Sequence, residues 1–145
     1  MNQVRRAFLK NAGAVGTVAI AIATGLLKPG AAFAAAWNSV AFTAKDMADS
    51  IKNAGYGGAT ESSDIVIKAP DIAENGAVVP VSATSNIPGT TSMAIFAAKN
   101  PAPLIAMFEF SNGMEPFIST RIKMAKTSLL RVSVEAGGNK YTTHT

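Results

Sequence analysis

Cysteine is absent from the 145 residues of the sequence, and there is a single histidine, His144. Disulfides and thiolate metal ligands are therefore excluded within these residues. Zinc and copper sites need several His or Cys ligands, so we expect no metal site. A catalytic triad would need His144 as its base, and a lone histidine in a polar terminal stretch is usually a solvated side chain.

Carboxylates are also few, and no close pair suited to general acid–base catalysis stands out. The acids of the later part of the chain are scattered: Asp64, Asp71, Glu74, Glu109, Glu115 and Glu135. The glycine cluster "GYGG" at residues 55–58 lacks the Gly-Lys-Ser/Thr that a phosphate-binding loop requires. We therefore predict no catalytic residue and no cofactor site, and that the protein is not an enzyme.

Positive charge is concentrated at the start of the chain. Four of the 13 basic residues lie in residues 1–34, which contain no acid, and the nine that remain balance the nine acids. This balance gives no reason to expect a nucleic-acid partner. A second basic group lies on the later strands without interleaved aromatic residues, and it is either a solvated strand face or a docking patch for an acidic partner: Arg121, Lys123, Lys126 and Arg131.

The first 34 residues have the pattern of an export signal. Arg5 and Arg6 form a twin-arginine pair followed by "AFLK", and a mildly apolar stretch then leads to "AFA", a small-x-small cleavage site. The alternative is a membrane-spanning helix, but the stretch is short against the roughly 20 apolar residues that a bilayer requires. We predict a twin-arginine signal peptide at 1–34, cleavage after Ala34, and a periplasmic mature domain at 35–145 that is not membrane-bound.

One helix is expected at the start of the mature domain. Thr43 is a plausible N-cap with Asp46 three residues later, and apolar residues follow at helical spacing from Ala44 to Ala54. Gly55 stands where a left-handed C-terminal cap belongs.

Seven segments after this helix alternate with the period of β-strands: 64–69, 76–84, 92–98, 104–110, 117–124, 128–136 and 140–145. Asn75-Gly76 is a hairpin-compatible pair, Pro88-Gly89 suits a type II turn, and Pro80 marks an edge or a bulge. In segment 104–110, the alternation places Leu104 on the same face as Phe108. We predict an all-β, immunoglobulin-like antiparallel sandwich of about seven strands behind a short helix.

Five stretches together resemble the SoxY family, the thiosulfate-oxidation carrier proteins of the bacterial Sox system. They are "IAENGAVVPV", "IPGT", "KNPAPLIAMFEF", "FISTRIKMAKTS" and "LRVSVEAGG". The resemblance implies a periplasmic carrier that forms a heterodimer with a SoxZ-like sandwich protein and meets other Sox enzymes transiently. It also implies that sulfur intermediates are held covalently on a cysteine in a C-terminal Gly-Gly-Cys-Gly-Gly arm, whose glycines allow one thiol to reach several active sites.

The sequence departs from the family at this arm, since it has no cysteine and ends in "NKYTTHT", inside an expected strand. No functional residue of the family can therefore be carried over. Two hypotheses follow. Either the sequence is a shortened form of a sulfur carrier, or it is an arm-less homologue that serves as a binding or scaffold module with a SoxZ-like partner.

Overall fold

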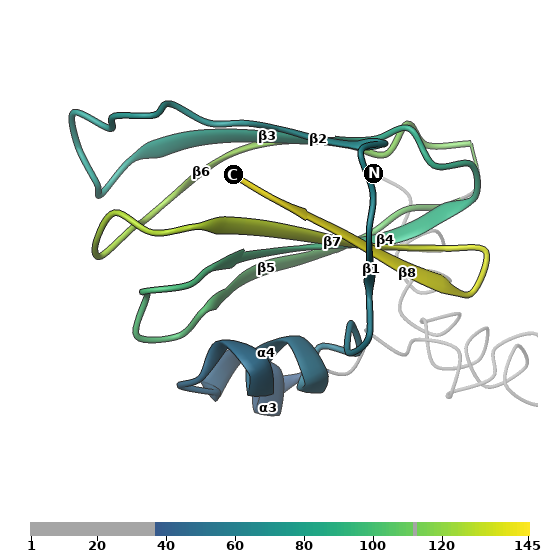
Figure 1. The fold of residues 1–145 in the computed structure, drawn as a ribbon, viewed down its shortest axis with the longest axis horizontal. Helices are drawn as coiled ribbons and strands as arrows, with labels where there is room; N and C mark the ends of the chain where they lie inside the picture. Colours follow the sequence, from purple (N-terminus) through teal and green to yellow (C-terminus); the bar gives the residue numbers. More distant parts are fainter. Residues whose placement is uncertain (1–36, 112) are drawn as a thin grey trace, which may run out of the picture. The chain divides into compact units, whose positions relative to one another are not determined.

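The expected strands form two sheets that pack face to face (Figure 1). The computed structural model describes residues 37–111 and 113–145, and residues 38–145 form one unit. The expected signal peptide, with Arg5, Arg6 and the cleavage position after Ala34, lies outside the described residues.

Eight strands make up the two sheets: β1 (Thr60–Glu61), β2 (Ile65–Lys68), β3 (Val79–Ser85), β4 (Thr90–Ala97), β5 (Leu104–Glu109), β6 (Phe117–Ile122), β7 (Leu130–Ala136) and β8 (Asn139–His144). One sheet has the order β1-β8-β7-β4-β5 and the other β2-β3-β6. Neighbouring strands are antiparallel, except that β1 runs parallel to β8. All seven expected strands are present, and the two-residue β1 was not expected.

The core between the sheets follows from the alternation of each strand. In β3, for example, Val79, Val81, Ala83 and Ser85 are buried while the intervening residues are not. The central cluster joins residues of both sheets: Ile65, Ala83, Met93, Ile95, Ile118, Val132 and Val134. The period-two pattern in the sequence therefore identified the inner face of β3 correctly.

Strand β4 is buried on both faces. Its residues Met93–Ala97 are all buried, because one face meets the other sheet and two short helices cover the opposite face. The helices α3 (Ser39–Thr43) and α4 (Met47–Asn53) lie on the side of the five-stranded sheet away from β2, β3 and β6 (Figure 1). The molecule thus has three layers, with β4 in the middle one.

The expected helix is α4, which is shorter than expected, and Thr43 is not its N-cap; a second helix, α3, precedes it. Thr43 is the last residue of α3, and its hydroxyl donates a hydrogen bond to the Ser39 carbonyl. The N-cap of α4 is Asp46, whose carboxylate accepts hydrogen bonds from the backbone N–H groups of Ala48 and Asp49 at 2.7 and 3.3 Å. An aspartate in extended conformation satisfies the free N–H groups of a helix start well, and it begins the helix later than expected.

Strand β5 contains an irregularity that the sequence pattern did not reveal. Ile95 of β4 pairs with Ala106, but the next residue, Phe96, pairs with Leu104, so that Ile105 is an extra residue. A bulge of this kind reverses the faces on either side of it. As a result Leu104 packs with Phe96 under the helices while Phe108 packs between the sheets, and the prediction of a shared face was wrong.

The connection between β2 and β3 is longer than a tight hairpin. Asn75-Gly76 lies within the loop 69–78, where the Asn75 side chain accepts from the Ala77 N–H at 2.9 Å. Strand β2 ends at Lys68 opposite Ser82, so Pro80 is paired only with Arg121 of β6, as expected for a proline at an edge. Gly89 has φ of 73°, in agreement with the expected turn.

Candidate functional site

Strand β8 ends one residue before Thr145, the last residue of the given sequence. It pairs with β7 from Ala136↔Asn139 to Arg131↔His144, and Leu130 and Thr145 exchange two backbone hydrogen bonds of 2.9 Å. The turn before it uses Gly137 and Gly138, both with positive φ, which glycine adopts without steric cost. The strand is therefore held in register to its last residue.

A second row of contacts fixes β8 on its other side. Thr60 and Glu61 of β1 pair in parallel with Tyr141 and Thr142, and the Ser62 N–H donates to the Thr142 carbonyl at 2.9 Å. The buried Thr142 hydroxyl also donates to the Val132 carbonyl and lies 3.1 Å from the Ser133 hydroxyl. Buried polar groups that are satisfied in this way fix one register.

His144 was expected to be a solvated side chain, and the structure places it against a carboxylate. Its Nδ1 atom lies 3.1 Å from the Oε1 atom of Glu61. Both side chains are substantially exposed, that of His144 at 43% and that of Glu61 at 68%. The contact depends on the parallel pairing of β1 with β8. Sequence reasoning could not have found it, because two residues of β1 show no alternation.

A cleft of about 960 Å³ opens beside the end of β8. Three connections frame it: the β2–β3 loop, the residues after β4, and the β6–β7 loop, with Thr145 in the wall. Gly76 and Met124 join two of these connections, since the Met124 N–H donates to the Gly76 carbonyl at 2.8 Å. A Cβ atom at Gly76 would lie only 2.9 Å from the Met124 carbonyl oxygen, so glycine permits this approach.

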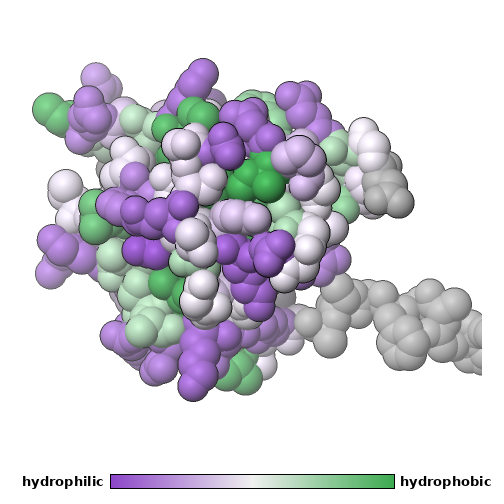
Figure 2. Space-filling model, turned by 45° about the vertical axis from the view of Figure 1, so that its right-hand side comes forward, coloured by the Kyte–Doolittle hydropathy of each residue, from purple (hydrophilic) through white to green (hydrophobic). Residues whose placement is uncertain are grey.

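The lining of the cleft is mainly apolar and includes three charged residues, Asp71, Lys99 and Lys126. Ile72 and Leu129 are large apolar side chains of the lining, exposed at 86% and 56%. The basic group expected from the sequence is not brought together, because Arg121 is on β6 and Arg131 is on β7 of the other sheet. On the face shown in Figure 2, hydrophobic residues form separate spots among hydrophilic ones.

Tyr56 is a buried polar residue on the helix side of the five-stranded sheet. Its hydroxyl shares a 2.8 Å hydrogen bond with the Ser92 hydroxyl, and its ring meets Phe96 edge to face at 6.4 Å. Burial raises the pKa of Tyr56, the bond to Ser92 acts in the opposite direction, and the charges of Glu135 and Glu109 add to the rise. The hydroxyl therefore stays protonated, in keeping with a structural role.

The described residues contain neither a metal-binding cluster nor a membrane-spanning helix. Across residues 37–111 and 113–145, no three His, Asp or Glu side chains gather so as to hold a metal ion. In that part of the chain, no helix has the length and apolar character needed to cross a membrane.

Comparison with known proteins identifies the family. The sequence model of "Sulfur oxidation protein SoxY" matches residues 52–145. The chain belongs to the SoxY family. Among solved structures, the sulfur carrier protein SoxY from Chlorobium limicola f thiosulfatophilum is 44% identical, with a TM-score of 0.62, covering 75% of this chain and 96% of that one.

The sandwich of this SoxY-family chain also resembles an unrelated protein. The superoxide reductase (neelaredoxin) from Ignicoccus hospitalis is 13% identical, with a TM-score of 0.50, covering 56% of this chain and 76% of that one. At this identity the likeness concerns the fold alone. No functionally curated protein matches the chain.

Proposed function

We propose that this protein is the sulfur-carrier subunit of a periplasmic Sox system, with its carrier cysteine on a segment that follows Thr145 in the complete protein. The observation that supports this most strongly is the 44% identity to a SoxY described as a sulfur carrier protein. The structure of β8 is consistent with such an extension, because the strand is fixed on both sides and ends beside an open cleft.

A carrier of this kind needs two parts with different physical properties, one rigid and one flexible. The sandwich provides a rigid base, and a flexible extension would bring one thiolate to several enzymes. We further propose that the sandwich pairs with a SoxZ-like protein in the periplasm. Purification from the native periplasm should give a two-protein complex, and isolation of this chain alone, as a monomer, would contradict the pairing.

The experiment that tests the carrier role is the intact mass of the protein from its native periplasm, with and without a thiol-alkylating reagent. A mass above that of residues 35–145 with one alkylated thiol supports the carrier. A mass equal to that of residues 35–145 without alkylation overturns it and supports an arm-less scaffold module instead. We keep the arm-less scaffold module as a second candidate function because the given sequence contains no cysteine.

We also propose that the cleft beside Thr145 shelters the bound sulfur group from water and free thiols. Its apolar side chains, such as Ile72 and Leu129, suit a sulfur adduct better than a hydrated ion. In the complete protein loaded with thiosulfate, Leu129→Asn should speed the loss of the loaded mass in dithiothreitol several-fold. Phe117→Asn is the matched control, since Phe117 is similarly exposed, at 50%, and does not line the cleft. Equal rates in both variants would contradict a sheltering role.

A further inference from the structure

A row of hydrogen-bond donors crosses the outer face of the three-stranded sheet. Lys68 of β2 pairs with Ser82 of β3, and Ser82 pairs with Ser119 of β6. Directly opposed residues of neighbouring strands share a face, with Cβ atoms about 4.5–5.5 Å apart. The ammonium group and the two hydroxyls can therefore reach one small ligand together.

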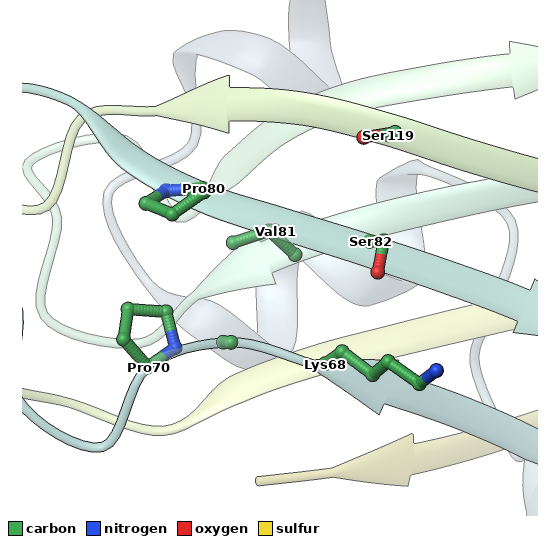
Figure 3. Close-up of a pocket in the computed structure, with 7 residues that line it drawn as sticks. Lys68, Pro70, Pro80, Val81, Ser82 and Ser119 are labelled. Atoms are coloured by element: carbon green, nitrogen blue, oxygen red, sulfur yellow. The ribbon is translucent and has the colours of Figure 1, made fainter.

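These three side chains line a shallow depression of about 290 Å³ (Figure 3). Figure 3 shows Lys68 and Ser82 next to each other on neighbouring strands, with Pro70 and Pro80 together at the opposite end. The segment Ala69–Pro70 lines both this depression and the cleft beside Thr145, so the two sites adjoin. The outer sheet face and the candidate functional site are thus neighbours.

The donors of the row have no partner among the described residues. Neither serine hydroxyl makes a side-chain hydrogen bond there, and the Lys68 ammonium makes no ion pair within that part of the chain. The residues that line the depression include no carboxylate. Arg121, paired with Pro80 in the next row of the same face, adds a second positive charge. Positive charge and free hydroxyl donors without a competing acid favour an anion.

We propose that Lys68, Ser82 and Ser119 form a non-covalent binding site for a small divalent tetrahedral oxyanion. The hydroxyls and the ammonium group would donate charge-assisted hydrogen bonds to its oxygens. Of such anions, thiosulfate fits best, because its terminal sulfur is a weak acceptor and can lie against the apolar end formed by Pro70 and Pro80. This choice of ligand rests on the proposed function; the oxyanion site itself rests on the row of donors.

The test is an NMR titration of backbone amides in the complete protein with sodium thiosulfate, sodium sulfate and sodium phosphate in turn, at constant ionic strength. The largest shifts should occur at the three residues of the row. Lys68→Met should weaken binding about tenfold, the size expected for losing one charge-assisted hydrogen bond. Lys52→Met is the matched control, because Lys52 is an exposed lysine of α4 that lines neither the depression nor the cleft, and this variant should bind normally.

The outcomes test separately whether the site exists and which anion it binds. Shifts spread over all lysines, or equal weakening by Lys68→Met and Lys52→Met, would overturn the site. Thiosulfate binding more tightly than sulfate and phosphate supports it as the ligand, and equal or tighter binding of phosphate overturns that assignment. The titration requires no cysteine, so its failure is distinguishable from a failure of the carrier role, which is read from the alkylated mass.

Discussion

Replacing Gly76 by alanine tests how the cleft is held open. Gly76 accepts a hydrogen bond from the Met124 N–H at 2.8 Å, and an added Cβ would lie 2.9 Å from the Met124 carbonyl oxygen. The Met124 oxygen is a backbone atom and the position of the Cβ is fixed by the backbone of residue 76, so neither can move aside as the end of a flexible side chain would. The β2–β3 loop must therefore separate from the end of β6.

The expected loss of stability has two contributions. Loss of the hydrogen bond costs about 1 kcal/mol, and forced displacement of packed backbone costs about 1–3 kcal/mol. Because the loop can relax in part, we expect Gly76→Ala to lower the free energy of unfolding by about 1–3 kcal/mol. For a domain near 100 residues, each kcal/mol lowers Tm by roughly 4 °C.

Urea denaturation followed by circular dichroism measures this loss, with Gly57→Ala as the control. A Cβ at Gly57 would meet nothing closer than the Lys52 Cα at 3.9 Å, and its φ is not positive. That variant should be neutral or slightly stabilised, since alanine restricts the unfolded chain. If the two variants differ by less than about 0.5 kcal/mol, within the usual range of surface substitutions, the close approach at Gly76 is not a constraint.

Substitutions at three further positions probe the layers around β4. Asp46→Ala should destabilise by about 0.5–2 kcal/mol in thermal melts through loss of the α4 cap, whereas Asp46→Asn should retain most of the stability; equal losses would argue against capping. Tyr56→Phe should cost about 1 kcal/mol at neutral pH. The wild type should lose stability above about pH 10, because its raised folded pKa favours the protonated form, and denaturation between about pH 9 and pH 11 should show no such component in Tyr56→Phe. Thr142→Val should cost about 1–3 kcal/mol by leaving the Ser133 hydroxyl buried without its side-chain partner, and a neutral result in urea denaturation would contradict this role.

The strands were predictable because burial of one face imposes alternation on the sequence. Val79, Val81 and Ala83 show this period directly, and each lies in the core. The bulge at Ile105 was not predictable, since the alternation of 104–110 continues through it without interruption. The start of α4 was missed because Thr43 and Asp46 both suit an N-cap locally, and tertiary packing decides between them.

The candidate site was less predictable from the sequence than the strands were. The family resemblance directed attention to the last strand, and the cleft beside that strand is assembled from three connections that are far apart along the chain. The row of Lys68, Ser82 and Ser119 depends on the register of two strand pairs. Alternation specifies which face a residue occupies and leaves open which residue lies opposite it.

The antiparallel ladder between β7 and β8 determines how the domain responds to mechanical force. A force applied to Thr145 along the axis of β8 loads this ladder lengthwise. The bonds of the six registered pairs from Ala136↔Asn139 to Arg131↔His144 are then sheared together and are not peeled apart one at a time. Such a ladder resists more tension than one opened from its end, so traction along β8 must load all six pairs before the sandwich yields.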